Sequence, residues 1–296
     1  MRVLLYVATN FAIMLVLWGV IQVLGLDQAL TQRGFQVGPM FAMCAIFGMG
    51  GSFISLLISK WMAKRATGAR VIEQPKSDAE AWLVQTVARQ AQSAGIGMPE
   101  VAIFPSDSPN AFATGASRDK ALVAVSEGLL RGMKRDEIEV VLGHEVSHVA
   151  NGDMVTLTLI QGVLNTFVFF LARVIGYAVD QFVFRGQSNR GGGGIGYFVV
   201  VLFAQIVLGI LASTIVMWFS RRREFRADAG GAQLGSRDGM IAALGSLKAL
   251  SEGQSEPLPD QIKAFGINDR SGFSRLFMSH PPLDERIDAL RRGAGA

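Results

Sequence analysis

Four long apolar runs constrain this chain more than any other feature of its sequence. The hydrocarbon core of a bilayer is about 30 Å thick, so a helix needs about 20 apolar residues to cross it. Each of the four runs reaches that length and is bounded by polar or charged residues. We therefore expect four transmembrane helices, at roughly 3–26, 37–59, 155–179 and 196–220.

The overall composition agrees with a membrane protein. Half of the residues are hydrophobic, and the mean hydropathy is +0.34, which is high for a soluble protein. The first run is not expected to be a cleaved signal peptide, because Arg2 alone precedes it and no small-residue cleavage site follows. Polar residues interrupt some runs, namely Asn10, Gln22 and Arg173. We expect Arg173 to snorkel or to pair inside the helix bundle.

Basic residues are distributed unevenly around the four runs. The loops after the first and third runs carry few of them, whereas the segments after the second and fourth runs carry most. The positive-inside rule places those richer segments in the cytoplasm. They hold Lys60, Lys64, Arg65 and Arg70 after the second run, and Arg221, Arg222, Arg223 and Arg226 after the fourth.

The same flanks largely explain the net charge of +4. Nothing in the pattern of basic and aromatic residues indicates nucleic-acid binding. The single cysteine, Cys44, excludes an intramolecular disulfide, which agrees with a reducing cytoplasm. We therefore expect this protein to contact the lipid bilayer and not to bind nucleic acid.

The charged sequence outside the runs is expected to form one domain in two parts, 60–153 and 221–296, separated by a transmembrane hairpin at 154–220. In the first part, Ser77 is expected to begin a helix with Glu80 as its capping partner. Three short apolar stretches follow and are typical of strands of a small sheet. They lie at 101–104, 111–114 and 121–125.

The sequence His144-Glu145-Val146-Ser147-His148 is the motif that carries the most chemistry. On a helix, residues four apart share a face, so His144 and His148 can bind one ion while Glu145 reaches a water on it. Asp136, with Glu139 three residues on, is expected to cap this helix. Lone histidines are more often ordinary surface or core residues, but this spacing around a glutamate favours a metal site.

Two carboxylates four residues apart follow the fourth run. Glu224 and Asp228 share a helix face, so Glu224 is a candidate third ligand and Asp228 a candidate hydrogen-bond acceptor for a histidine ring. Alternatively, both only neutralise the neighbouring arginines, and spacing alone does not decide between these interpretations. His280 is the one other histidine, and it either binds an oxyanion during catalysis or caps a turn.

The small side chains of Asn110, Ala111, Phe112, Ala113 and Thr114 indicate a possible edge strand. An exposed edge can bind an extended peptide through main-chain hydrogen bonds and so accept many sequences. The alternative is an ordinary strand followed by a turn.

Four stretches together resemble the HtpX family of bacterial membrane-bound heat-shock metalloproteases, and more distantly the type I CAAX prenyl proteases. They are N-A-F-A-T-G at 110–115, H-E-V-S-H at 144–148 followed by N-G-D-M, R-R-E-F-R-A-D at 222–228, and F-M-S-H-P-P-L-D-E-R-I at 277–287. With the layout of four apolar runs, the resemblance covers nearly the whole chain.

This resemblance implies an α+β zincin-like catalytic domain of the gluzincin type, with a small β-sheet and a four-helix transmembrane region. It implies Glu224 as the third ligand of one Zn²⁺ per chain, beside His144 and His148. The implied role is quality control and stress response at the bacterial inner membrane, by cleavage of misfolded or damaged membrane proteins on the cytoplasmic side. Self-cleavage is a further expectation.

The mechanism expected from these residues is hydrolysis by a metal-activated water. Zinc lowers the pKa of its bound water to about 7, and Glu145 takes the proton and passes it to the leaving amine. One alternative is a zinc-binding membrane scaffold or transporter without proteolytic activity, which would not need Glu145. Another is an intramembrane metalloprotease, but the charges of Lys134, Arg135 and Asp136 argue against burial of the motif in lipid.

Overall fold

The computed structural model describes residues 36–182, 194–253 and 280–293, together with positions 15, 16, 19, 22 and 23. The chain forms two compact units. Residues 1–55 and 157–216 form the first, which we call the helical unit, and residues 56–156 and 217–296 form the second, the sheet unit.

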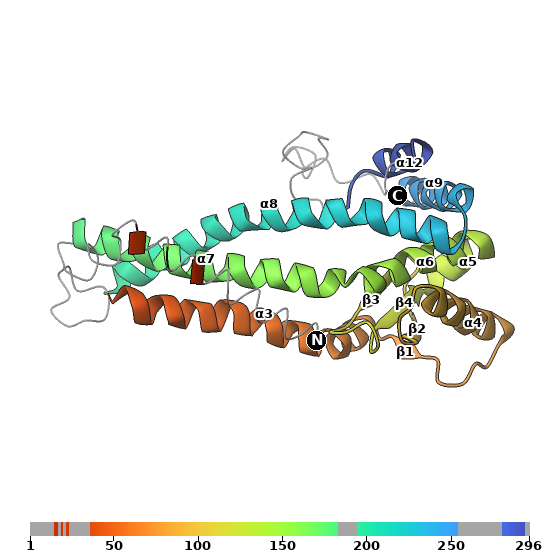
Figure 1. The fold of residues 1–296 in the computed structure, drawn as a ribbon, viewed down its shortest axis with the longest axis horizontal. Coiled ribbons are helices and arrows are strands. Elements are labelled where there is room, and N and C mark those ends of the chain that lie inside the picture. The colour runs from red at the N-terminus through yellow and green to blue at the C-terminus, as the bar shows by residue number, and fades with distance from the viewer. Residues whose placement is uncertain are drawn as a thin grey trace. The chain divides into compact units, whose positions relative to one another are not determined.

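Three described helices are long and apolar enough to cross a membrane. They are α3 (Val37–Thr67), α7 (Asp153–Phe182) and α8 (Ile195–Leu234). The most apolar 18-residue segments of these helices have mean hydropathies of 2.0, 1.8 and 2.6, respectively. In the helical unit these helices run side by side (Figure 1). Most of the predicted span at 3–26 lies outside the described residues, and its described positions 15, 16, 19, 22 and 23 are helical.

All three helices extend beyond the apolar runs that predicted them. Helix α3 continues to Thr67 and α8 continues to Leu234, well past the charged residues that follow each run. Hydropathy marks only the apolar part of such a helix, because charged residues such as Arg and Glu are good helix formers outside lipid. In the helical unit, Phe41 of α3 packs edge to face on Phe170 of α7, with ring centroids 5.3 Å apart.

The sheet unit contains a four-stranded mixed sheet in the order β1-β2-β4-β3. Its strands are β1 (Arg70–Val71), β2 (Glu100–Phe104), β3 (Ala111–Thr114) and β4 (Leu122–Ser126). Strand β2 is parallel to β4, whereas the outer strands β1 and β3 are antiparallel to their neighbours. The three predicted strands are confirmed, and the two-residue β1 was too short to predict.

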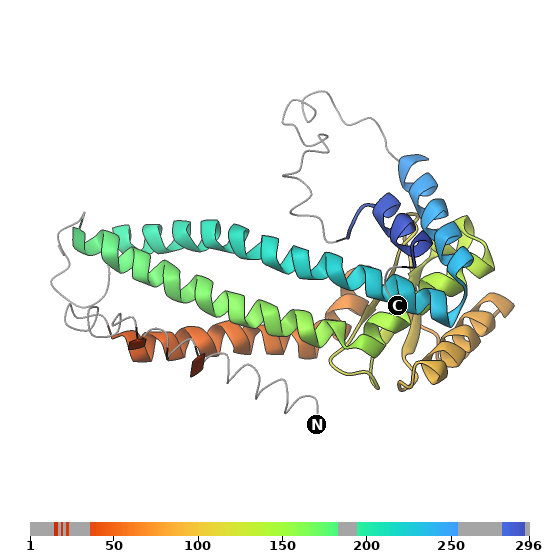
Figure 2. The ribbon, with the colours of Figure 1, turned by 45° about the horizontal axis from the view of Figure 1, so that its top comes forward.

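The helices of this unit are α4 (Asp78–Ser93), α5 (Glu127–Gly132), α6 (Arg135–Asn151), α9 (Arg237–Gly253) and α12 (Leu283–Arg291). Figure 2 shows α9 and α12 side by side, and both elements contact each other directly. The predicted cap of α4 is confirmed, because the Ser77 hydroxyl accepts a hydrogen bond from the Glu80 N–H.

The main hydrophobic core lies between the sheet and the helices. Alternate residues of β4 face opposite sides, as in any strand: Val123 and Val125 belong to the main core, whereas Leu122 and Ala124 belong to a smaller cluster. Burying each valine or leucine side chain contributes about 1.5–3 kcal/mol. The main core also contains Leu83 and Val87 of α4, Leu142 and Val146 of α6, Met240 and Leu244 of α9, and Ile287 and Leu290 of α12.

The predicted cap of α6 was wrong. The helix begins at Arg135, so Lys134 is the capping residue, and the Glu137 carboxylate accepts a hydrogen bond from the Lys134 N–H (3.0 Å). Asp136 lies inside the first turn, and Glu139 pairs with Arg89 of α4 (2.6 Å). The sequence pattern favoured Asp136 because a carboxylate can accept from helix N–H groups, whereas the Lys134 side chain makes no capping hydrogen bond.

Candidate metal centre

Helix α6 carries both histidines of the motif on one buried face. The Nε2 atoms of His144 and His148 lie 3.1 Å apart, and their rings meet edge to face. The helical spacing of four residues produces this convergence. Glu145 lies between them on the same helix and is half-buried, and its negative charge acts on His148.

Glu224 reaches the same point from α8. Its Oε1 lies 3.3 Å from Nε2 of His148, its Oε2 lies 3.5 Å from Nε2 of His144, and its side chain is 1% exposed. Among the described residues, these three form the group of ligating atoms that could hold a metal ion. Ligands 2.0–2.1 Å from a tetrahedral zinc ion are about 3.3–3.5 Å from each other. The two nitrogen–oxygen separations lie in this range, and the 3.1 Å between the two Nε2 atoms lies just below it, so the three side chains are close to the arrangement that a zinc ion needs.

A close helix crossing makes this meeting possible. Gly230 of α8 packs on the motif helix at Ser147, where an added Cβ would lie 2.3 Å from the Ser147 hydroxyl oxygen. No side chain fits in that space, so the two helix backbones approach closely. Glu224 lies just under two turns before this glycine on the same helix, which brings its carboxylate to the histidines.

A carboxylate also meets the outer nitrogen of each imidazole ring. Nδ1 of His148 donates to Oδ2 of Asp153 (2.7 Å), and Nδ1 of His144 lies 2.9 Å from Oδ1 of Asp228, although the angle there departs from that of a hydrogen bond. A protonated Nδ1 leaves Nε2 with its lone pair free for a metal. Both rings are therefore oriented as ligands.

The carboxylates make the site electrostatically suited to a cation. Burial lowers the pKa of His148, but its hydrogen bonds to Asp153 and Glu224 outweigh this effect and raise the pKa to about 9. Burial likewise opposes the charged form of His144, and contacts with Asp228 and Glu224 again outweigh it and raise the pKa. Positive charge is thus stabilised where the two Nε2 atoms meet.

Arg286 of α12 holds the carboxylates in place. Its Nε and Nη2 donate to the two oxygens of Asp228 at 2.8 and 2.5 Å, and its Nη1 lies 3.6 Å from Oε2 of Glu224. Such bidentate pairing fixes both distance and plane. Burial lowers the pKa of Arg286, but the hydrogen bonds to Asp228 and the charge of that carboxylate outweigh this effect and raise the pKa.

His280 also lies at this site. Its Nδ1 is 2.6 Å from Oε2 of Glu224, and its side chain is 61% exposed. The ring is thus partly open to solvent on one side and in contact with a candidate ligand on the other. Its predicted role in binding an oxyanion stays a prediction.

Asp153 and Arg286 were not identified from the sequence. Asp153 follows Gly152, whose positive φ of 73° ends α6 and turns the chain into α7. That turn returns Asp153 to His148, five residues earlier. The stretch N-G-D-M contributed to the family resemblance, but no role was inferred for Asp153 itself. Arg286 had no local signal, because its role depends on the packing of α12.

Strand β3 lies at one edge of the described sheet, and α6 packs against it. The Ser126 N–H donates to the Asn110 carbonyl (2.8 Å), and the antiparallel register pairs Phe112 with Ala124. Bonded and non-bonded pairs alternate in such a ladder. The N–H and C=O groups of Ala111 and Ala113 therefore point away from β4.

We expect Asp153→Asn to weaken metal binding by about 10–100-fold, because the carboxylate that orients His148 is lost. Asp153 tests this role more cleanly than Asp228, whose replacement would also leave Arg286 buried without its partner. The measurement is a competition titration of metal affinity. Asp180→Asn, the same change on the same helix outside the site, is the control. Equal affinity in both variants would contradict the orienting role.

This chain is similar to known peptidases over most of its length. Residues 77–294 match the model of peptidase family M48. Protease HtpX of Tolumonas auensis is 58% identical over 291 residues, covering 98% of each chain. Protease HtpX of Nitrosococcus oceani is 58% identical over 295 residues, and the Protease HtpX homolog of Thiobacillus denitrificans is 57% identical over 292 residues, each again covering 98% of both chains.

Among solved structures, the crystal structure of S. mikatae Ste24p matches with a TM-score of 0.58 and 20% sequence identity. The match covers 94% of this chain and 67% of that chain. At this identity the likeness concerns the fold alone.

Proposed function

Because this chain belongs to peptidase family M48 and is a membrane-bound metalloprotease, we propose that it is a zinc-dependent endopeptidase of the gluzincin type. The observation that carries this proposal is the convergence of His144, His148 and Glu224 within ligand distance of one another. Its substrates are misfolded or damaged membrane proteins, cut on the cytoplasmic side of the bacterial inner membrane. Self-cleavage is part of the same proposal.

In this proposal each residue of the centre has a distinct role. His144, His148 and Glu224 hold Zn²⁺, while Asp153 and Asp228 orient the imidazole rings. Bound zinc supplies a Lewis acid that activates water and polarises the substrate carbonyl. The Glu145 carboxylate takes a proton from the attacking water and passes it to the leaving nitrogen. His280 lies beside Glu224 and is proposed to donate a hydrogen bond to the oxyanion.

We propose that the chain crosses the membrane four times, with the first span at 3–26 and the peptidase parts 60–153 and 221–296 in the cytoplasm. The basic flanks support this orientation. Arg222 stacks on Trp218 with 4.5 Å between the guanidinium carbon and the ring centroid, and Arg65 lies over Trp61 at 5.8 Å. Tryptophan and arginine are enriched where a helix leaves the bilayer, so both pairs suit that boundary.

We further propose that β3 binds the substrate as an added strand. The outward main-chain groups of Ala111 and Ala113 suit an extended peptide, and the strand packs on the helix of the motif. Main-chain pairing tolerates many side chains, which fits an enzyme that cuts damaged proteins of unrelated sequence. A folded substrate has no free extended segment, so this binding mode also favours unfolded regions.

Ala113→Pro tests the substrate strand. The change removes one outward N–H without touching the ladder to β4, and proline is tolerated on such edges. We expect kcat/KM for peptides to fall roughly 2- to 12-fold, the effect of one net hydrogen bond, with zinc content unchanged. Phe112→Pro removes an N–H that faces β4 and should instead lower the melting temperature. Equal effects of the two changes would contradict the register.

The overall proposal is tested by purifying the full chain in detergent and treating it with a chelator. We expect cleavage of an unfolded membrane protein to stop and to return on zinc addition, with the helical circular-dichroism signal largely retained. Long helices and a hydrophobic core, rather than the metal, hold this fold, unlike small zinc domains. Zinc binding without cleavage would favour a scaffold or transporter, and cleavage that survives chelation would exclude metal catalysis.

A further inference from the structure

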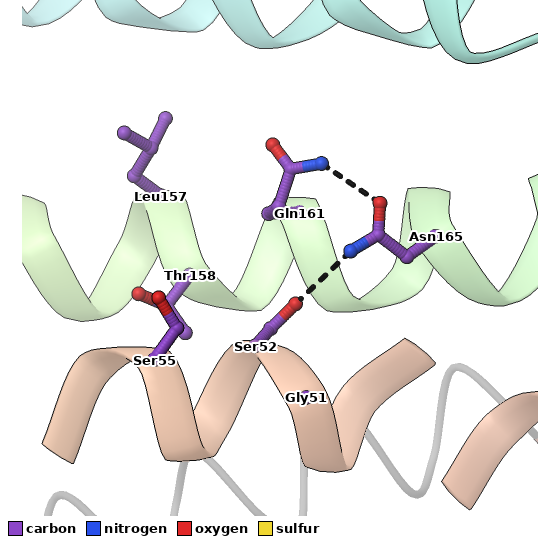
Figure 3. Close-up of a pocket in the computed structure, with 7 residues that line it drawn as sticks. All are labelled: Gly51, Ser52, Ser55, Leu157, Thr158, Gln161 and Asn165. Carbon is purple, nitrogen blue, oxygen red and sulfur yellow. Dashed lines mark hydrogen bonds between the residues drawn. The ribbon is translucent and has the colours of Figure 1, made fainter. Parts of the chain in front are cut away.

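Polar side chains gather at one place between two helices of the helical unit. Ser52 and Ser55 of α3 lie beside Asn165 and Thr158 of α7, and Gln161 of α7 is hydrogen-bonded to Asn165 (Figure 3). Both helices are otherwise strongly apolar. A polar group in lipid is costly unless it is paired, and such groups are therefore rare in spanning helices unless they have a function.

Hydrogen bonds fix the direction of the two carboxamides. Gln161 Nε2 donates to Asn165 Oδ1 (2.9 Å), Asn165 Nδ2 donates to Ser52 Oγ (3.3 Å), and the Ser52 hydroxyl donates to the carbonyl of Gly48 (3.0 Å). A carboxamide has two N–H donors and an oxygen that accepts twice. Among the described residues, these hydrogen bonds use one N–H of each amide, so a second N–H on each amide and the Gln161 oxygen are left for another partner.

The polar residues line a cavity of about 260 Å³. Gly51 and Ser55, which are exposed, lie at its rim. An apolar cavity of about 150 Å³ already holds benzene, so this one has room for a side chain of the size of Asn or Gln. None of the described residues that line it is charged. Its chemistry therefore suits a neutral group that both donates and accepts hydrogen bonds, rather than an ion or a phosphate.

We propose that this cavity binds polar side chains that misfolded transmembrane segments expose to lipid. Native membrane proteins bury such groups inside their own bundles, so an Asn or Gln facing lipid marks a failure of folding. A carboxamide-lined cavity in a spanning unit offers that group a partner. The proposal rests on the proposed function, and it adds that substrates are chosen inside the bilayer before they are cut outside it.

The test uses the full-length Glu145→Gln chain in lipid nanodiscs, where substrate binds but is not cut. The probe is a Leu-rich transmembrane peptide with one central Asn beside a photo-crosslinking residue, compared with the same peptide carrying Leu. Interhelical hydrogen bonds in membranes are modest, so we expect roughly 3- to 30-fold more crosslinking of the Asn peptide. The crosslinks should map to α3 and α7.

Two variants on α7 locate the effect. Asn165→Leu removes the middle of the hydrogen-bond chain, and Gln161→Leu leaves the Asn165–Ser52 bond intact, so the second tests the cavity with less disturbance of packing. Both should abolish the preference for Asn. Thr214→Val on α8, outside the cavity, should preserve it. A preference that survives both α7 changes, or equal crosslinking of the two peptides, would overturn the proposal.

The chain's own predicted first span is the competing occupant, since it carries Asn10 and Gln22. If the preference appeared only after Asn10→Leu and Gln22→Leu, the cavity would belong to this span and the proposal would be wrong. A cleavage assay distinguishes failure of this proposal from failure of the proposed protease function. With Glu145 retained, the α7 variants should cut a soluble unfolded peptide at the unaltered rate, whereas a chain that is not a protease would cut neither substrate.

Discussion

Glu145→Gln is expected to lower kcat for peptide hydrolysis by about 10²–10⁴-fold, the usual contribution of a general base, while zinc stays bound at one ion per chain. The amide has nearly the shape of the carboxylate but cannot take a proton. Glu145 is half-buried on α6 and has no place in the ligand group, so metal binding does not depend on it. Hydrolysis of a fluorescent peptide and zinc analysis by mass spectrometry measure the two quantities.

The matched control is Glu139→Gln, the same change two turns earlier on the same helix. Glu139 pairs with Arg89 at the surface, so its replacement should leave both cleavage and zinc unaltered. If Glu145→Gln cut peptides at the full rate, the base would be another group. A zinc-binding scaffold or transporter would then explain the motif equally well.

Glu224→Ala is expected to lose zinc and activity together. Two histidines one turn apart occupy only two corners of a tetrahedron, and Glu224 supplies both the third donor and the negative charge between them. Its side chain is almost fully buried, so water replaces it poorly. A zinc titration of the purified variant, followed by a peptide assay, measures both losses.

Two neighbouring changes separate ligand loss from milder effects. Asp228→Ala should weaken zinc binding and activity by only about 10–100-fold, since Asp228 orients a ring instead of holding the ion. His280→Ala should keep its zinc and lose rate alone. Stoichiometric zinc in Glu224→Ala, together with zinc loss in His280→Ala, would reverse the ligand assignment.

The local features of this chain could be predicted from its sequence. Helical periodicity alone puts His144 and His148 on one face, and strand β3 matches the predicted 111–114. Hydropathy identified the cores of α3, α7 and α8 but not their charged extensions, which carry Glu224. The cap of α6 was misplaced because Asp136 is chemically the better capping residue, whereas the approach of the chain at Lys134 decided the start.

Tertiary relations could not be predicted in the same way. On spacing alone, Glu224 remained a candidate ligand and Asp228 a candidate acceptor for a histidine ring, or both only neutralised arginines. Nothing local reports the crossing of α8 over α6 at Gly230. Asp153 contacts His148, five residues earlier in the chain, and Arg286 contacts Asp228, 58 residues earlier. The resemblance to a known family assigned Glu224 where periodicity could not, and it did not single out the residues that orient the ligands.

X-ray absorption at the zinc edge of the purified, zinc-loaded chain tests the central claim most directly. We predict one zinc per chain, bound by two imidazole nitrogens and by oxygen ligands at about 2.0–2.2 Å, as expected for His144, His148 and Glu224. Imidazoles give distinct multiple scattering, so their number can be counted. A third imidazole would place His280 on the metal, and a zinc–sulfur distance near 2.3 Å would place the ion elsewhere; either result would contradict the assignment.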